Sequence, residues 1–115
     1  MPTHTILEET RQIVFNLGPA AEVPFGLGRC FQVMGEEVAV FRQRDGRIFA
    51  VQNRCPHRGG PLADGLAGNG SVVCPLHAHK FDLCSGHGSE RHECVKTFHV
   101  TIVGGEIHLS GEKQS

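Results

Sequence analysis

The sequence of 115 residues lacks the features that would assign it to a membrane or to nucleic acid. It has no apolar run near the roughly twenty residues that a membrane-spanning helix needs. Its first residues lack the basic and then apolar pattern of a secretory signal. The formal net charge of -1 provides no basic field for nucleic acid or for an anionic membrane. We therefore expect protein partners, no nucleic acid, no membrane and a cytoplasmic location.

Motifs of substrate chemistry are also missing. The sequence contains no nucleophile with an adjacent base, no phosphate-binding loop and no pair of carboxylates placed for acid–base catalysis. No window shows convincing helical periodicity. These absences indicate a chain that has no substrate site of its own and is not a helical domain.

The residues that are present predict one small all-β domain. A chain of this length with 39% apolar residues can bury a single modest core. Its short β-rich runs alternate with turn residues, among them 15 glycines, which is typical of an antiparallel sandwich or barrel. We expect polar tails at residues 1–11 and 111–115. The expected strands cover residues 12–17, 30–34, 37–43, 47–52, 71–73 and 81–83.

Two hairpins are expected within this domain. Asp45-Gly46 predicts a two-residue turn between strands 37–43 and 47–52, because Asp-Gly between β-rich runs is a strong turn signal. The second hairpin closes the chain and turns at Gly104-Gly105. By alternation its inward residues are Phe98, Val100, Ile102, Ile107 and Leu109, and its outward residues include His99 and His108.

Four candidate metal ligands form two mixed pairs. Cys55 and His57 are a Cys-x-His pair, sixteen residues follow, and Cys74 and His77 are a Cys-x-x-His pair. Thiolates and imidazoles together suit either a [2Fe-2S] cluster of the Rieske type or a structural zinc ion. Zinc sites usually separate a Cys pair from a His pair, whereas two mixed loops can each give a thiolate to one iron and an imidazole to the other. The spacing favours the cluster and leaves zinc open.

Glycines and prolines surround these ligands. Bridging sulfides carry negative charge and need backbone N–H donors close by. We expect the glycines to permit that approach and the prolines to stiffen the two loops. The residues concerned are Gly59, Gly60, Gly65, Gly68 and Gly70, together with Pro56, Pro61 and Pro75.

The motifs CPHRGG and CPLHAHKFD resemble the signature of the Rieske domain family. The flanking words QNRCPHRGGPLADG, FDLCSG, CVKTFHV and GGEIHL are similar to the small subunit of assimilatory NAD(P)H nitrite reductase, and more loosely to Rieske ferredoxins of ring-hydroxylating oxygenases. The resemblance covers about residues 28–110. It implies a Rieske iron-sulfur fold, in which an antiparallel β-sandwich base carries a small cluster-binding subdomain. We place the Rieske domain at residues 12–110 and the subdomain at residues 53–84.

The resemblance implies electron transfer through one [2Fe-2S] cluster held by Cys55, His57, Cys74 and His77. As a nitrite reductase small subunit, the chain would pair with a large subunit that carries flavin, a further iron-sulfur cluster and sirohaem. As a ferredoxin, it would pass electrons from a flavin reductase to a terminal oxygenase. A third interpretation, from a different class, is a zinc-stabilised β module that only binds a partner protein.

The resemblance also predicts a reduction potential in the lower part of the Rieske range of about -150 to +300 mV. High-potential relatives place a Ser and a Tyr hydroxyl near the cluster, at positions that match His79 and Phe81 here. Phe81 has no hydroxyl to donate. The same relatives link their loops by a disulfide whose cysteines would fall at Gly60 and Leu76. Neither position holds a cysteine.

The remaining polar residues receive simpler interpretations. Cys30, Cys84 and Cys94 are expected to be packed thiols, and a bridge between Cys84 and Cys94 is not expected in a reducing compartment. The two ligand imidazoles should lie at the protein surface, where a short path leads to a partner's cofactor. His79 is either a docking residue or a solvated one. Arg58 and Lys80 either steer an acidic partner or are ordinary surface charges. His87 and His92 are expected to be solvated loop residues.

Overall fold

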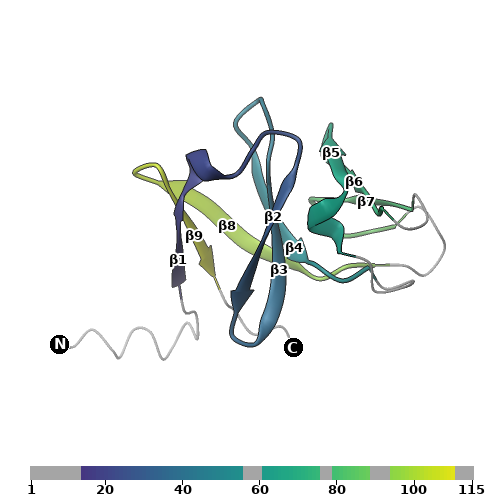
Figure 1. Cartoon of the computed structure of the whole chain (residues 1–115), viewed down its shortest axis with the longest axis horizontal. Coiled ribbons are helices and arrows are strands. Elements are labelled where there is room, and N and C mark those ends of the chain that lie inside the picture. The colour runs from purple at the N-terminus through teal and green to yellow at the C-terminus, as the bar shows by residue number, and fades with distance from the viewer. Residues whose placement is uncertain (1–13, 56–60, 76–78, 89–93, 111–115) are drawn as a thin grey trace.

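The computed structural model describes residues 14–55, 61–75, 79–88 and 94–110. These residues form two antiparallel sheets, a six-stranded base sheet and a three-stranded small sheet (Figure 1). Both predicted tails lie outside the described residues, and the predicted limits of the domain and subdomain stay predictions. The base sheet contains β1 (Val14–Pro19), β2 (Gly28–Val33), β3 (Glu36–Arg42), β4 (Ile48–Gln52), β8 (Thr97–Val103) and β9 (Glu106–Ser110), in the order β1-β9-β8-β4-β3-β2.

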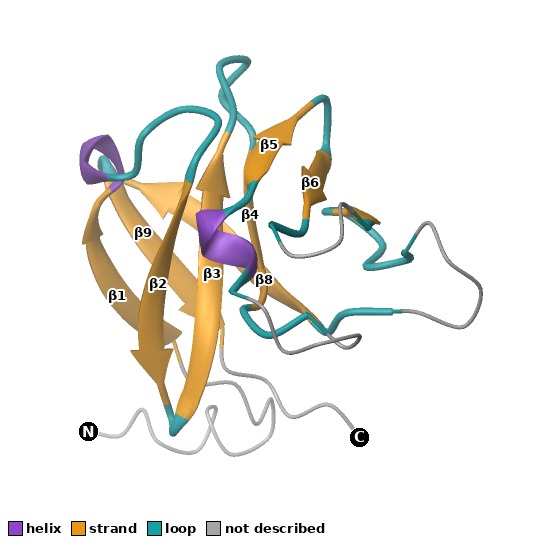
Figure 2. Ribbon diagram, turned by 45° about the vertical axis from the view of Figure 1, so that its right-hand side comes forward, coloured by secondary structure: helices purple, strands orange, loops and turns teal. Residues whose placement is uncertain are grey.

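The small sheet contains β5 (Leu66–Gly68), β6 (Ser71–Val73) and β7 (Lys80–Asp82), in that order. Two short 3₁₀ helices complete the described structure, η1 (Ala20–Glu22) and η2 (Leu62–Asp64). Figure 2 shows η2 beside β2 and β3, at the point where the chain passes from the base sheet to the small sheet. The prediction of an all-β fold with a base and a smaller unit is confirmed.

Strand β3 is buried on both of its faces. Val38 and Val40 pack into the core of the base sheet, whereas Ala39 and Phe41 point into a second core. All four side chains are fully buried, which accounts for the uninterrupted apolar run in the sequence. The second core holds the small sheet against the base. It consists of Ala39, Phe41, Val51, Cys55, Leu62, Ala63, Val72, Cys74, Phe81, Leu83 and Val95.

The hairpin between β3 and β4 is confirmed, but its turn is longer than the predicted two residues. Residues 43–47 connect the strands, and the amide of Gly46 donates to the Gln43 carbonyl. Gly46 has a positive φ of 97°, whereas Asp45 does not adopt the left-handed region. A two-residue turn of this hairpin type requires positive φ at both central residues. The Asp45 carboxylate instead accepts the Arg47 amide at 3.0 Å.

The last hairpin is confirmed. Gly104 and Gly105 both have positive φ, as a two-residue turn requires. In the antiparallel pairing of β8 with β9, Val100 lies opposite Leu109 and Ile102 lies opposite Ile107. Ile107 and Leu109, the two predicted inward residues of β9, are fully buried. Ile102, beside the turn in β8, is 38% exposed.

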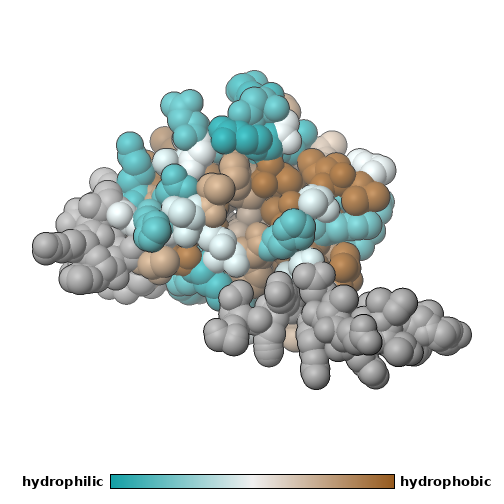
Figure 3. All heavy atoms as spheres, turned by 180° about the vertical axis from the view of Figure 1, so that it is seen from behind, coloured by the Kyte–Doolittle hydropathy of each residue, from teal (hydrophilic) through white to brown (hydrophobic). Residues whose placement is uncertain are grey.

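Exposed apolar side chains also occur on the base sheet. Val14 in β1 and Val103 in β8 are more than half exposed. Hydrophobic residues gather over the base side of the molecule in the view from behind (Figure 3). Among the described residues, no helix is long and apolar enough to cross a membrane.

Candidate metal centre

The structure brings the two predicted cysteine ligands into one buried cluster of side chains. Cys55 follows β4 and is 2% exposed, and Cys74 follows β6 and is 1% exposed. Both belong to the second core, although the two cysteines come from different sheets. The two predicted imidazole ligands, His57 and His77, lie outside the described residues. The cysteine positions are thus compatible with one shared centre, while the assignment of all four ligands stays a prediction.

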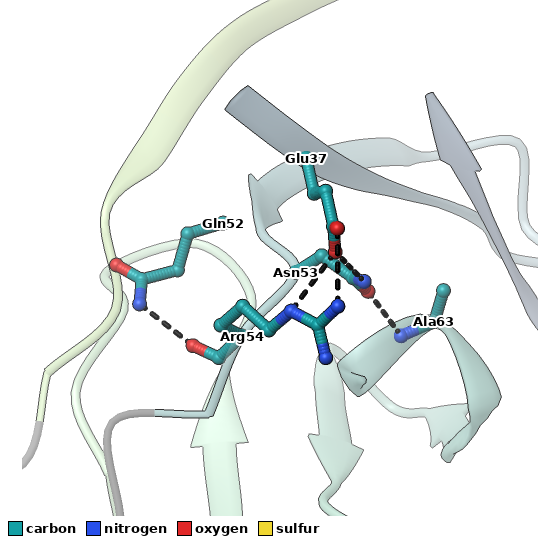
Figure 4. A network of polar contacts seen from close by, with 5 residues as sticks. All are labelled: Glu37, Gln52, Asn53, Arg54 and Ala63. Atoms are coloured by element: carbon teal, nitrogen blue, oxygen red, sulfur yellow. Dashed lines mark hydrogen bonds and ion pairs between the residues drawn. The ribbon is translucent and has the colours of Figure 1, made fainter. Parts of the chain in front are cut away.

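Asn53 fixes the start of the first ligand loop. Its backbone carbonyl accepts the Leu62 amide at 2.6 Å, and its side-chain Oδ1 accepts the Ala63 amide at 2.8 Å. The two ends of the loop are therefore joined through one residue, which is 3% exposed. Arg54 and Pro61 form an isolated antiparallel bridge inside this closure. Figure 4 shows the side-chain part of this network.

Glu37, at the start of β3, holds the same loop from the base sheet. Its carbonyl accepts the Asn53 amide at 3.0 Å, and its Oε1 accepts Asn53 Nδ2 at 3.0 Å. The Arg54 guanidinium donates through Nε to Oε1 and through Nη2 to Oε2, each at 3.0 Å (Figure 4). The hydrogen bond from Asn53, followed by that from Arg54, holds the pKa of Glu37 below its usual value.

Gln52 connects this network to the segment before β8. Its amide donates to the Lys96 carbonyl at 2.8 Å, and its Oε1 accepts the Lys96 amide at 2.7 Å. Its Nε2 donates to the Arg54 carbonyl at 2.7 Å (Figure 4). Lys96 forms an ion pair with Glu36 at 2.9 Å. The sequence words QNR and CVK, which are far apart in the chain, therefore meet at the base of the first ligand loop.

The second ligand loop is closed by backbone contacts. The Cys74 amide donates to the His79 carbonyl at 2.7 Å, directly after the pairing of Val73 with Lys80. The next pair in this ladder joins Val72 and Phe81, and both side chains are fully buried. The Phe81 ring is therefore a core side chain and supplies no hydroxyl to this region.

Among the described glycines of this region, Gly65 and Gly70 have roles in the small sheet. A Cβ on Gly65 would lie 2.0 Å from the Val73 carbonyl oxygen, so its close approach is to β6. Gly70 has a φ of 79° and follows Asn69 with a φ of 51°, which makes the turn between β5 and β6. A Cβ on Gly68 would meet no atom within 4 Å. Gly59 and Gly60 lie outside the described residues, and the approach of the glycines to sulfides stays a prediction.

The prediction of packed thiols for the other cysteines is wrong. Cys30, Cys84 and Cys94 are exposed and free. Cys30 lies on the edge strand β2, and Cys84 lies in the turn after β7, where neighbouring elements leave side chains uncovered. Partial burial raises the pKa of the Cys30 thiol, and the nearby charge of Glu37 raises it further. None of these thiols joins the buried cluster that contains Cys55 and Cys74.

The donor chemistry fits a Rieske centre. Two buried thiols in one side-chain cluster match the two thiolates that such a centre places on one iron. Within the described residues, no group of three or more His, Cys, Asp or Glu side chains could hold a metal ion. The two histidines that would complete the set, His57 and His77, lie outside the described ranges.

Comparisons with known proteins place these features in a family. A model of the Rieske [2Fe-2S] domain matches residues 14–100. The ferredoxin component of the naphthalene 1,2-dioxygenase system of Pseudomonas aeruginosa is 32% identical over 90 residues, which are 76% of this chain and 86% of that protein. The solved structure of a chain assigned as an NADPH nitrite reductase small subunit superposes with a TM-score of 0.78 and 27% identity, covering 84% of this chain and 97% of that one.

The ferredoxin of carbazole 1,9a-dioxygenase from Nocardioides aromaticivorans superposes equally well. Its TM-score is 0.77 at 28% identity, over 87% of this chain and 98% of that one. The 4β-methylsterol monooxygenase of Methylococcus capsulatus is 42% identical, but over 62 residues that make up 17% of its length. This chain therefore covers less than a fifth of the length of the monooxygenase. It covers most of the length of the small electron-transfer proteins.

Proposed function

Because this chain belongs to the Rieske [2Fe-2S] domain family and is an electron-transfer domain, we propose that it is the small subunit of a cytoplasmic NAD(P)H-dependent nitrite reductase. The family implies one [2Fe-2S] cluster, which supplies reversible one-electron transfer without bond-making. We assign the ligands as Cys55, His57, Cys74 and His77. The two cysteines are buried in one side-chain cluster, which supports half of this assignment.

The observation that carries the nitrite reductase proposal is the resemblance of the segments that flank the ligands, and a near-complete match to one small subunit supports it. The superposition covers 97% of that chain at 27% identity. The words QNR and CVK, which are among those that resemble nitrite reductase small subunits, also contact one another through Gln52 and Lys96. They support the first ligand loop, so the resemblance lies in residues with a structural role beside the proposed centre.

The proposed partner is a large subunit that carries flavin, a further iron-sulfur cluster and sirohaem. In this arrangement the chain has no substrate site, and its role is to hold an electron carrier against the partner. Burial of Cys55 and Cys74 keeps their sulfur atoms out of water. Phe81 offers no hydroxyl, which supports a potential in the lower part of the Rieske range, and a midpoint above about +100 mV would contradict this.

A second candidate function is a ferredoxin that passes electrons from a flavin reductase to a ring-hydroxylating oxygenase. The 32% identity to the naphthalene dioxygenase ferredoxin, over 86% of that protein, favours it. A related solved structure is a complex of the oxygenase and the ferredoxin of carbazole 1,9a-dioxygenase, which superposes with a TM-score of 0.77 and 25% identity. Both candidates use the same cluster and differ only in partners.

Affinity purification of the tagged chain from its native host distinguishes the nitrite reductase subunit from the ferredoxin. Recovery of a sirohaem protein, with nitrite-dependent oxidation of NAD(P)H, supports the nitrite reductase subunit. Stimulation of a ring-hydroxylating oxygenase by the purified chain and a flavin reductase, without recovery of a sirohaem protein, supports the ferredoxin. A colourless chain that holds one zinc ion and no sulfide would contradict both.

A further inference from the structure

We propose that Glu37 is a positioning residue for the proposed metal centre and sets the geometry of the first ligand loop through Asn53 and Arg54. This inference rests on the assignment of Cys55 as a ligand and applies to either candidate function. Glu37 is eighteen positions before Cys55 in the sequence and is not one of the four assigned ligands.

Three N–H groups meet at the Glu37 carboxylate. Glu37 accepts Asn53 Nδ2 and two guanidinium N–H groups of Arg54, each at 3.0 Å. A bidentate pair between Arg and a carboxylate fixes orientation as well as distance. Asn53 and Arg54 are the two residues directly before Cys55. The carboxylate therefore acts on the segment that leads into the proposed ligand.

Asn53 passes this constraint to the far end of the first ligand loop. Its side-chain amide is oriented by Glu37 through Nδ2, which leaves Oδ1 facing the Ala63 amide at 2.8 Å. An Asn side chain held at one end only could rotate and lose this contact. Because Asn53 is 3% exposed, water does not replace a lost partner at low cost. Glu37 thus governs both ends of the loop.

Strand β3 provides a rigid support for Glu37. Val38, the next residue, is fully buried, and the alternating side chains of β3 fill both cores. Residues that orient metal ligands typically affect metal affinity by about 10- to 100-fold when they are changed. The position of Glu37 between a doubly buried strand and the ligand loop is the arrangement in which such an effect is expected.

Glu36 is a matched control. It is the neighbouring residue, has the same charge and also forms an ion pair, but its partner is the exposed side chain of Lys96. Both oxygens of its carboxylate accept Lys96 Nζ, at 3.2 Å and 2.9 Å. Glu36→Ala and Glu37→Ala therefore remove the same charge from adjacent positions, and only the second change removes the proposed constraint.

The test compares the holoproteins of wild type, Glu36→Ala, Glu37→Ala and Glu37→Gln. Bleaching of the visible absorption by a chelator should accelerate about tenfold or more in Glu37→Ala and less than about twofold in Glu36→Ala. Glu37→Gln keeps an acceptor for Asn53 but loses the ionic pair with Arg54, so its rate should be intermediate. The EPR spectrum of the reduced protein should change its g values in Glu37→Ala and keep them in Glu36→Ala.

Hydrogen exchange gives a readout that does not depend on electron transfer. The amides of Leu62 and Ala63 should exchange faster in Glu37→Ala, while amides of the β8–β9 hairpin keep their protection. Equal bleaching rates and unchanged g values in the two alanine variants would overturn the proposal. If Glu37→Ala does not fold, the same comparison between Glu37→Gln and Glu36→Gln decides it. Retention of colour by Cys55→Ser would instead overturn the ligand assignment, which separates the two failures.

Discussion

The two ligand loops are held in different ways. The first loop is fixed by side chains: Asn53 joins its ends, and Glu37 and Gln52 tie its beginning to the base sheet and to the segment before β8. The second loop is fixed by backbone contacts, namely the Cys74–His79 hydrogen bond and the short ladder between β6 and β7. The geometry of one half of the proposed centre therefore depends on particular side chains, and that of the other half depends on the small sheet.

This difference predicts which substitutions each loop tolerates. A backbone ladder accepts many side chains as long as the strands stay paired, whereas a network of buried and ionic side chains depends on their identity. The two halves meet in the second core, which contains both Cys55 and Cys74. Substitutions in either half can therefore be compared by their effects on one shared centre.

The largest expected effect comes from a proposed ligand of the second loop. Cys74→Ser should abolish the visible chromophore and destabilise the small sheet, because the buried position loses its thiolate. Absorption spectra together with iron and sulfide analysis measure this. Cys84→Ser is the control, since Cys84 is exposed and lies in a turn. A colourless Cys84→Ser would mean that the wrong thiolates have been assigned.

Gly65→Ala should be the next most severe change. The added Cβ would lie 2.0 Å from the Val73 carbonyl oxygen, so the backbone of β6 must shift. We expect a loss of about 3 kcal/mol in the free energy of unfolding. Gly68→Ala, at the end of β5, which begins directly after Gly65, should cost less than about 1 kcal/mol because a Cβ there meets no atom within 4 Å. Urea unfolding followed by circular dichroism compares the two, and equal losses would show that the contact with β6 is unimportant.

Asn53→Ala tests the first loop by the same measurement. The change leaves the buried Ala63 amide without its partner and removes one of the donors to the Glu37 carboxylate, and we expect a loss of about 2 kcal/mol. Asn16→Ala is the control, because Asn16 is exposed and bonds to the surface residue Glu106. Its cost should be below about 0.5 kcal/mol. A loss for Asn53→Ala as small as that of the control would argue against a side-chain anchor.

The smallest expected effect concerns pH. The pKa of Glu37 is lower in the folded protein than in the unfolded chain. The ionised carboxylate therefore contributes fully to the free energy of unfolding above the unfolded pKa near 4.5. That contribution is lost as the pH falls through the lower folded value. Glu37→Gln should therefore show a shallower fall of stability than the wild type as the pH falls below about 4.5. Parallel curves for the two proteins would contradict this prediction.

The sequence was informative wherever structure depends on neighbouring residues. Strand 71–73 was predicted with its observed bounds, and both predicted hairpins are present. Strand β5 was missed, because three residues that include a glycine give no periodic signal. The two 3₁₀ helices were missed because each is only three residues long and gives no periodic signal.

The site was predicted less completely, because its anchors depend on contacts between distant segments. Glu37 meets Asn53 and Arg54 across sixteen and seventeen positions, and an acidic residue beside a turn is usually only solvated. The sequence offered one weak signal, the Asn-Arg pair directly before Cys55. The exposure of Cys30 was also unpredictable, since it depends on β2 being an edge strand.

The double burial of β3 has a consequence for the chain before it folds. Residues 38–41 form a short apolar segment of high β propensity, and in an unfolded chain such a segment can pair with copies of itself. Glu36 and Glu37 precede it and Arg42 follows it, which places charges at both ends. Charged residues that flank an unavoidable apolar strand oppose aggregation. The charge of Glu37 is thus expected to oppose self-association of the unfolded chain, in addition to its proposed role beside the ligand loop.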